Sequence, residues 1–293
     1  MLTRRRFNAT LCTAIGFLLS NRSTMASPSS PRFAEDMNRL EAKSGGRLGV
    51  AVLDTKDGSL LQHRGDERFP MCSTFKLLAA AAVLKGSGDD LAGLRHRVRF
   101  DKSDLVTYSP ETEKHVGDEG MSLAEICEAA ITLSDNTAGN LMLKNIGGPE
   151  GLTNFARSLG DQVTRLDRIE PDLNEAVPGD VRDTTSPNAM AANVRKLLLG
   201  DALNAAARDQ LIRWLVANKT GNTRLRAGLP HGWRVGDKTG TGRLGTSNDV
   251  AIVWPTNRTP LIIACYLTGS TLEAGAQNET IASIGRAVGA AFG

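Results

Sequence analysis

The chain has 293 residues, and its 35 lysines and arginines against 32 aspartates and glutamates give a formal charge of +3. A content of 41% hydrophobic and 23% charged residues is ordinary for a soluble globular protein and excludes a disordered, collagen-like or low-complexity chain. Aromatic residues make up only 4%, which argues against a stacking surface for single-stranded nucleic acid. The length suits one large domain or two closely packed ones.

The excess of positive charge comes from the first 26 residues. They hold no acid and four arginines: Arg4, Arg5, Arg6 and Arg22. An apolar stretch around Leu11–Leu19 follows, too short to span a bilayer, and small residues surround Ala26. This pattern predicts a signal peptide of the twin-arginine type, residues 1–26, that is cleaved near Ala26 after export to the periplasm or medium. The alternative is a basic amphipathic N-terminus that stays attached.

Strand patterns gather at the two ends of the chain, and helical periodicity fills the middle. The predicted strands are Arg47–Asp54, Ser59–Arg64, Trp233–Lys238, Asp249–Trp254 and Leu261–Leu267. The predicted helices are Thr74–Lys85, one after the capping box of Ser122 and Glu125, Asn136–Asn145, Pro149–Leu159, Ser186–Leu199, Ala205–Val216 and Asn278–Phe292, the last with Asn278 as N-cap. Arg165–Asp183 shows neither period and is predicted as a loop, of a length that is uncommon unless functional.

This order of elements predicts an α+β fold. Hairpin-length links favour an antiparallel sheet, here five-stranded, built from both chain ends and flanked by helices. The helical middle would form an inserted all-helical lobe, and the cleft between lobe and sheet is the expected place for an active site. The expected domains are a sheet domain of residues 27–65 and 217–293 and a helical domain of residues 66–216.

Cysteines and histidines are too dispersed to indicate a disulfide framework or a metal site. Cys12 would leave with the signal peptide, and an odd number remains: Cys72, Cys127 and Cys265. The four histidines, without ligand spacing, are His63, His96, His115 and His231. No metal or other cofactor is therefore expected.

The first motif with chemical potential is Ser73-Thr74-Phe75-Lys76, at the start of an Ala- and Leu-rich helix. Residues three apart share a helix face, so Lys76 can approach the Ser73 hydroxyl, which needs such a base to act as a nucleophile. The helix N-terminus would favour a developing oxyanion. Because serine and lysine are common, this spacing alone is weak evidence.

The second motif is Ser134-Asp135-Asn136, at the junction of two helical segments. Asn136 has donor and acceptor atoms for bridging, and Ser134 is suited to relaying a proton. Taken alone, the triplet is more typical of a helix N-cap.

The third motif is Lys238-Thr239-Gly240-Thr241, at the end of a predicted strand. The lysine offers a positive charge for a carboxylate, and Gly240 would let a substrate lie close to the backbone. A second copy, Lys219-Thr220-Gly221, is interpreted as a helix stop with Gly221 near the C′ position. The later copy is preferred because an edge strand can pair with an extended substrate. The G-x-G-x-x-G pattern from Gly240 is not a dinucleotide signature, because a strand and not a helix follows it.

Together and in this order, the three motifs form the signature set of penicillin-recognising serine enzymes. From about Arg32 to Phe292 the chain resembles a class A serine β-lactamase. Glu170 and Asn174 resemble the E-x-x-L-N motif of that family's Ω-loop, and a carboxylate and an amide on a proline-shaped turn are suited to holding one water between them. The alternative is a solvated acidic loop. Arg168 and Asp183 match the family's pair at the base of this loop.

The resemblance implies a hydrolase that opens the β-lactam amide of penicillins and cephalosporins and so confers antibiotic resistance. Ser73 would form the acyl-enzyme, with its own backbone N–H and that of Thr241 as oxyanion hole, and Ser134 would protonate the departing nitrogen. Glu170 would activate the water that releases the product; whether it or Lys76 is the acylation base stays open. The implied binding residues are Tyr108 at the cleft rim, Asn136, Asn174, Arg224, Lys238, Thr239, Gly240 and Thr241.

Departures from the family pattern bear on specificity. Where some members carry an arginine after the third motif, this chain has Ser247. Arg224 matches an arginine that other members use, and it is preferred over Arg226, which is interpreted as a surface charge on a helix. Cys72 matches a disulfide-bonded cysteine of one carbapenem-hydrolysing subgroup. Because Gly242 stands at the partner position, Cys72 is expected to be a buried free thiol.

Other functions share part of this signature. A penicillin-binding transpeptidase or carboxypeptidase would use the serines and lysines without Glu170. A β-lactam sensor would stay acylated and needs a membrane span or a fused signalling domain, and the sequence predicts neither. The expected protein is a monomer that acts on small molecules, without nucleic-acid or, after signal cleavage, membrane partners.

Overall fold

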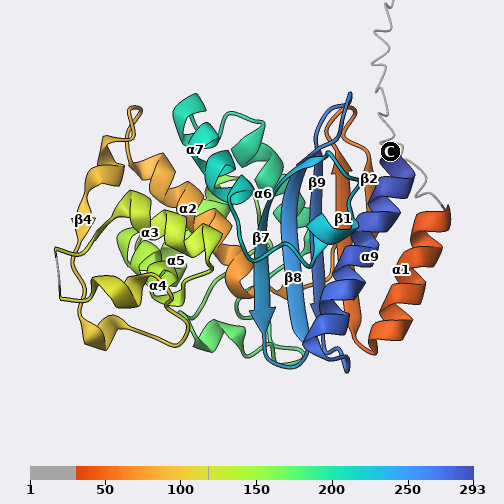
Figure 1. The fold of residues 1–293 in the computed structure, drawn as a ribbon, viewed down its shortest axis with the longest axis horizontal. Helices are drawn as coiled ribbons and strands as arrows, with labels where there is room; N and C mark the ends of the chain where they lie inside the picture. The colour runs from red at the N-terminus through yellow and green to blue at the C-terminus, as the bar shows by residue number, and fades with distance from the viewer. Residues whose placement is uncertain (1–30, 118) are drawn as a thin grey trace, which may run out of the picture.

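A computed structural model describes residues 31–117 and 119–293, so the predicted signal peptide and Cys12 lie outside the described residues. The main sheet is antiparallel and has the strand order β2-β1-β9-β8-β7 (Figure 1). Its strands are β1 (Arg47–Asp54), β2 (Leu60–His63), β7 (Arg234–Gly242), β8 (Thr246–Trp254) and β9 (Leu261–Thr268). The predicted five-stranded sheet from both chain ends is confirmed.

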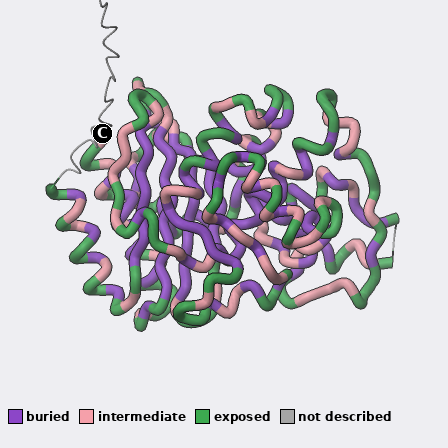
Figure 2. The backbone as a smooth tube through the Cα atoms, turned by 180° about the vertical axis from the view of Figure 1, so that it is seen from behind, coloured by how far each residue is buried: buried purple, intermediate pink, exposed green. Residues whose placement is uncertain are grey.

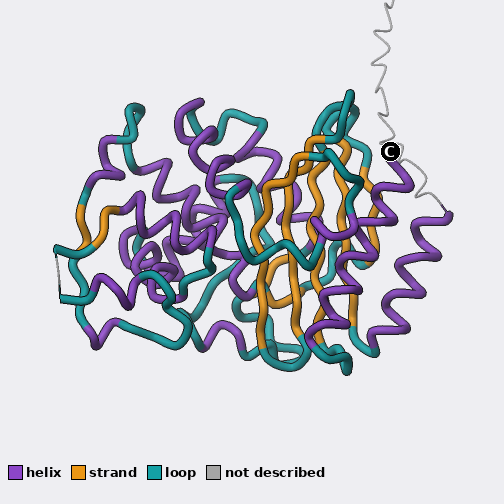
Figure 3. Tube along the Cα trace, in the orientation of Figure 1, coloured by secondary structure: helices purple, strands orange, loops and turns teal. Residues whose placement is uncertain are grey.

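The sheet is buried on both faces, which explains the near-continuous apolar runs of its strands (Figure 2). Side chains alternate between faces, so Val50 and Val52 join one core cluster while Ala51 and Leu53 join the other. Helices α1 (Pro31–Ser44) and α9 (Ala274–Phe292) cover the first face. The helical lobe lies on the other side of the sheet (Figure 3).

The remaining helices of the described part fall close to their predicted positions. They are α2 (Phe75–Gly86), α3 (Leu123–Thr132), α4 (Asn136–Asn145), α5 (Gly148–Ser158), α6 (Pro187–Leu198) and α7 (Ala205–Val216). The short α8 (Leu225–Gly228) was not predicted. Two small ladders pair β3 (Phe69–Pro70) with β6 (Thr184–Thr185) and β4 (Arg97–Val98) with β5 (Met121–Ser122). No helix between residues 31 and 293, residue 118 aside, is long and apolar enough to span a membrane.

Several sequence predictions need correction. Helix α1 was not predicted, although Phe33, Met37 and Leu40 have helical spacing and are buried. The prediction that Asn278 caps the last helix is wrong. Helix α9 begins at Ala274, and Asn278 instead accepts a hydrogen bond from Arg224 Nε at 2.9 Å.

Strand β7 does not end at Lys238 but continues through the third motif to Gly242. The connection to β8 is tight, with left-handed Leu244 (φ 52°) and Gly245 (φ 61°), so pairing persists to the turn. The interpretation of Gly221 as a helix stop is also wrong, because α7 ends at Val216. A Cβ on Gly221 would lie 2.0 Å from Asp237 Oδ2, so glycine is needed there for the close approach to β7.

One buried carboxylate holds the junction between α3 and α4. Asp135 caps α4 by accepting the Ala138 N–H at 2.8 Å, which confirms the N-cap interpretation for this member of the triplet. Asp135 also accepts the backbone N–H groups of Glu111 and Thr112, each at 3.0 Å. The capping by Asp135 leaves the side chains of Ser134 and Asn136 free for contacts in the cleft.

We predict that Asp135→Ala lowers the free energy of unfolding by about 3 kcal/mol, because buried N–H groups lose their acceptor. Urea denaturation measures the change. The matched control is Asp101→Ala, which removes the capping carboxylate of an exposed short helix and should cost about 1 kcal/mol. Equal losses for the two variants would contradict the assigned role of Asp135.

Candidate active site

Ser73 and Lys76 lie one turn apart where a short 3₁₀ turn, Cys72–Thr74, runs into α2. Cys72 is left-handed (φ 45°), an uncommon conformation for a residue with a Cβ. Lys76 Nζ donates to Ser73 Oγ at 3.1 Å, as the i, i+3 spacing predicted. The Ser73 hydroxyl in turn donates to Glu170 Oε1 at 3.2 Å.

Lys76 connects several groups of the candidate site. Besides Ser73, its Nζ donates to the Ser134 carbonyl oxygen at 2.8 Å and Asn136 Oδ1 at 2.7 Å. It also pairs with Glu170 Oε1 at 3.0 Å, and neither side chain is exposed. Burial lowers the pKa of Lys76 and outweighs the opposing effect of the Glu170 charge.

Glu170 is held on its other side by two asparagines. Asn174 Nδ2 donates to Glu170 Oε2. Asn140 brackets the Glu170 backbone: its Oδ1 accepts the Glu170 N–H at 2.9 Å and its Nδ2 donates to the Glu170 carbonyl at 3.0 Å. Sequence reasoning missed Asn140, although it stands four residues after Asn136 and so shares a face of α4.

Asn174 also carries an acceptor beside the carboxylate. Its Oδ1 is buried and, among the described residues, has no hydrogen-bond partner. An amide oxygen beside a carboxylate oxygen matches the pair of acceptors that the two protons of one water require. The alternative of a solvated acidic loop is wrong for Glu170, which is 1% exposed and contacts Asn174 directly.

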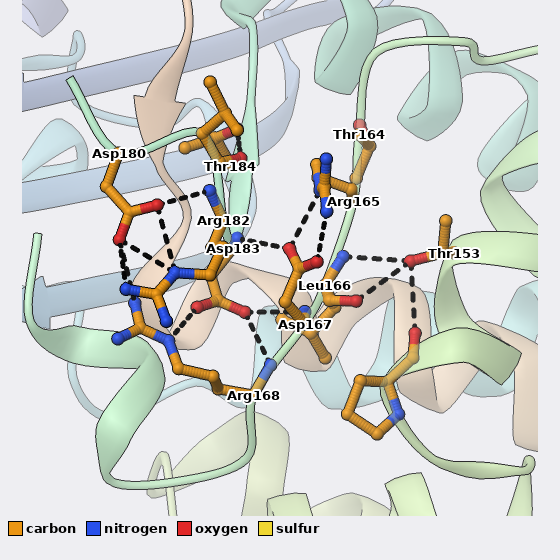
Figure 4. Close-up of polar contacts among 12 residues, drawn as sticks. Thr153, Thr164, Arg165, Leu166, Asp167, Arg168, Asp180, Arg182, Asp183 and Thr184 are labelled. Carbon is orange, nitrogen blue, oxygen red and sulfur yellow. Dashed lines mark hydrogen bonds and ion pairs between the residues drawn. The ribbon is translucent and has the colours of Figure 1, made fainter.

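The base of the loop that carries Glu170 is closed by a reciprocal clasp (Figure 4). Asp183 Oδ1 accepts the backbone N–H groups of Asp167 at 2.7 Å and Arg168 at 2.9 Å. Its Oδ2 pairs with Arg168 Nε at 2.6 Å, and Asp167 returns a bond by accepting the Asp183 N–H at 3.1 Å. Asp183 is 1% exposed, so this pair is worth more than a surface bridge.

Lys238 reaches the same cleft from the edge strand β7. Its Nζ donates to Ser134 Oγ at 3.0 Å and to the Thr239 carbonyl at 2.7 Å. Burial, assisted by the nearby charge of Lys76, holds the pKa of Lys238 well below its ordinary value. The two lysines thus contact opposite sides of Ser134, one at its carbonyl and one at its hydroxyl.

Arg224 is buried against strands β7 and β8. Its guanidinium donates to the carbonyls of Gly240 and Asn248 and to Thr241 Oγ1, each at 2.7 Å. Arg224 contacts the predicted substrate-binding residues through the Thr241 hydroxyl. Burial lowers the pKa of the Arg224 guanidinium. The interpretation of Arg226 as a surface charge is wrong, because its Nε pairs with buried Asp237.

The other predicted positions are more peripheral. Tyr108 is 58% exposed, and its backbone carbonyl accepts the Asn136 N–H at 2.9 Å. A Cβ on Gly240 would lie 2.8 Å from the Met71 carbonyl oxygen. The close packing of β7 against Met71 therefore requires glycine at this position, whether or not a substrate lies there. The Ser247 hydroxyl donates to Gln277 Oε1 at 2.8 Å.

The three cysteines of the described part are free and buried: Cys72, Cys127 and Cys265. Burial raises the pKa of the Cys72 thiol, which lies against Gly242. Within residues 31–117 and 119–293, no group of three or more His, Cys, Asp or Glu side chains is arranged to hold a metal ion.

Comparison with known proteins places these residues in context. The sequence model of the β-lactamase enzyme family matches residues 32–292. β-Lactamase OXY-1 of Klebsiella oxytoca is 50% identical over 94% of each chain, and β-lactamase AST-1 of Nocardia asteroides is 52% identical over 92% of this chain and 86% of its own. Among solved structures, an ancestral class A β-lactamase is 63% identical with a TM-score of 0.86, covering 89% of this chain and 100% of its own.

The lowered pKa of Lys238 predicts how stability depends on pH. Between the folded and the unfolded pKa the unfolded chain binds more protons, so the unfavourable burial of this charge is fully present at low pH and is relieved as pH rises to the ordinary lysine value. We predict that Lys238→Met is more stable than wild type at neutral pH and that its advantage shrinks toward pH ~10. Urea unfolding at several pH values measures this, and an advantage that grows with pH would contradict it.

Proposed function

The chain belongs to the class A serine β-lactamases, and from this premise we propose how its cleft divides the catalytic work. Ser73 is the nucleophile, Lys76 and Glu170 are its proton-handling partners, and Ser134 is the proton donor to the leaving nitrogen. The observation that carries this proposal is the position of Ser73 Oγ, 3.1 Å from a buried ammonium and 3.2 Å from a buried carboxylate. A serine hydroxyl with two such neighbours is suited to losing its proton as it attacks.

In the acylation step, Ser73 Oγ attacks the lactam carbonyl carbon and the carbon–nitrogen bond breaks. The backbone N–H groups of Ser73 and Thr241 stabilise the oxyanion. The Ser134 hydroxyl gives its proton to the nitrogen while Lys238 Nζ, 3.0 Å away, stabilises the negative charge that develops on the Ser134 oxygen. The proton that Ser73 loses then passes to Ser134 Oγ, so Ser134 is again a hydroxyl and the base is again free before deacylation. Glu170 and Lys76 both contact the Ser73 hydroxyl, so Glu170 as a carboxylate, or Lys76 once it is a neutral amine, is placed to accept the Ser73 proton.

In the deacylation step, a water attacks the ester carbon while Glu170 takes its proton. The ester bond to Ser73 Oγ then breaks, and the proton returns to that oxygen. The unpartnered Asn174 Oδ1 beside Glu170 supports this role, because a water bound to both would be oriented for attack. Asn140 positions Glu170 through its backbone.

Substrate binding falls to the edge strand and the rim. Lys238, Thr239 and Thr241 hold the substrate carboxylate, Asn136 and the backbone at Gly240 position the acyl amide, and Tyr108 borders the opening. Arg224 acts through Thr241, which it contacts at 2.7 Å. Penicillins and cephalosporins share the carboxylate and lactam that this arrangement would recognise.

We also propose the domain boundaries, the cellular location and the oligomeric state of the enzyme. Residues 27–65 and 217–293 form the sheet domain, residues 66–216 the helical domain, and residues 165–183 the Ω-loop. The protein is exported through a twin-arginine type of signal, acts as a periplasmic or secreted monomer, and confers resistance. The arginine-rich start of the sequence supports export.

Glu170→Ala tests the division of roles. We predict that wild type turns over a chromogenic cephalosporin many times, whereas the variant turns over roughly 100- to 10,000-fold more slowly because its water lacks a base. Intact-protein mass spectrometry should then find a stable adduct on Ser73. The matched control is Asp172→Ala, which removes an exposed carboxylate from the same loop and should leave turnover unchanged. A wild-type adduct that persists for hours would instead favour the transpeptidase or sensor function.

Export has its own test. We predict that protein recovered from the periplasm begins near residue 27, as N-terminal sequencing would show. Replacing Arg4 and Arg5 by lysine should trap the uncleaved chain in the cytoplasm if the signal is of the twin-arginine type. An exported chain that still begins at Met1 would contradict cleavage.

A further inference from the structure

The second K-T-G copy, unassigned so far, lies against the first. The loop that follows α7 meets β7 at two side-chain contacts: Asn218 Nδ2 with Asp237 Oδ2 at 2.6 Å, and Thr220 Oγ1 with Thr239 Oγ1 at 2.5 Å. Gly221 permits this approach. Thr220 is therefore the direct neighbour of a hydroxyl that the proposed function assigns to the substrate carboxylate.

The direction of these hydrogen bonds follows from chemistry. The Asp237 carboxylate, ion-paired with Arg226, only accepts, so the Asn218 NH₂ group must face it. Asn218 Oδ1 then faces Thr220 and accepts both its backbone N–H at 3.0 Å and its hydroxyl at 2.8 Å. The Thr220 hydroxyl therefore donates its only proton to Asn218 Oδ1.

These contacts also fix the direction in which the Thr239 hydroxyl donates its proton. Because Thr220 has no further proton to give, the 2.5 Å contact must run from the Thr239 hydroxyl to Thr220 Oγ1. Thr239 therefore directs its proton away from the carboxylate site and presents lone pairs toward it. A carboxylate oxygen, which also only accepts, would be repelled by that arrangement.

Thr241 shows the opposite arrangement on the same side of β7. Its hydroxyl accepts from Arg224 Nη2 at 2.7 Å, and a guanidinium can only donate. The Thr241 proton is thus free for an anion in the cleft. Thr239 lacks such a fixed donor and depends on Thr220 for one.

We propose that Thr220 is a positioning residue for carboxylate recognition, whose hydroxyl turns from Asn218 to Thr239 when the substrate binds and so frees the Thr239 proton for the anion. The inference rests on the proposed binding of the substrate carboxylate by Thr239. The turn leaves no buried acceptor unpaired, because Asn218 Oδ1 keeps the Thr220 backbone N–H at 3.0 Å. Only protons on hydroxyl rotors move.

The test compares a penicillin with its methyl ester, which lacks the charge. In Thr220→Val the ratio of kcat/KM for the acid to that for the ester should rise about three- to tenfold, through KM rather than kcat, because the Thr239 proton is no longer held by residue 220 and binding no longer breaks the Thr220–Asn218 hydrogen bond. Thr220→Ser should restore the wild-type ratio. In a Thr239→Val background, Thr220→Val should have no further effect on that ratio.

A matched control separates this role from the loss of any buried hydroxyl. Thr268→Val removes one member of the Thr246–Thr268 pair, 2.8 Å apart, and should leave the acid-to-ester ratio unchanged. An unchanged or lowered ratio in Thr220→Val, an equal change for acid and ester, or a Thr220→Ser variant that does not restore the wild-type ratio would overturn the inference while the proposed function stands. Wild type that hydrolyses neither compound would instead refute the proposed function and the inference with it.

Discussion

The cleft depends on a buried ion pair, Lys76 with Glu170, whose 3.0 Å contact has no exposed side-chain surface on either partner. Removing two charges from water costs several kcal/mol each, and their attraction offsets that cost only where further hydrogen bonds satisfy both groups. Lys76 obtains these from Asn136 and Ser134, and Glu170 from Asn174. The Ser73 hydroxyl contacts both partners, so the groups that stabilise the pair also define the position of the nucleophile that we propose.

Much of the surrounding structure serves to hold this pair in place. The Asp135 cap orients α4, which carries Asn136 and Asn140, and the clasp of Asp183 with Arg168 closes the loop that carries Glu170. Left-handed backbone occurs at Cys72 and Ser134, which flank the pair, and at Asp183 in the clasp. Such conformations persist only where neighbouring contacts enforce them, and they cluster at functional sites. In this protein, stability and catalytic geometry draw on the same contacts.

Sequence periodicity predicted the sheet and most helices because their core positions repeat at periods of 2 and 3.6 residues. It failed where tertiary contacts decided the outcome: Asn278 resembles a helix cap but bonds to Arg224, and Gly221 resembles a helix stop but makes room for Asp237. The motifs identified Ser73, Lys76, Ser134, Glu170 and Lys238 because their residue types carry chemistry. Asn140 and Thr220, for which we propose positioning roles, were missed because each contacts the backbone or hydroxyl of another residue, which sequence spacing does not reveal.

The most direct measurement of the central pair is the titration of Lys76, followed by NMR on protein with isotope-labelled lysine side chains. We expect a Lys76 pKa below that of an ordinary lysine, because the effect of burial outweighs that of the Glu170 charge. We further expect that Glu170→Gln lowers this pKa more, because the opposing charge is removed while burial remains. A Lys76 pKa at or above the ordinary value, or one that Glu170→Gln leaves unmoved, would contradict the account.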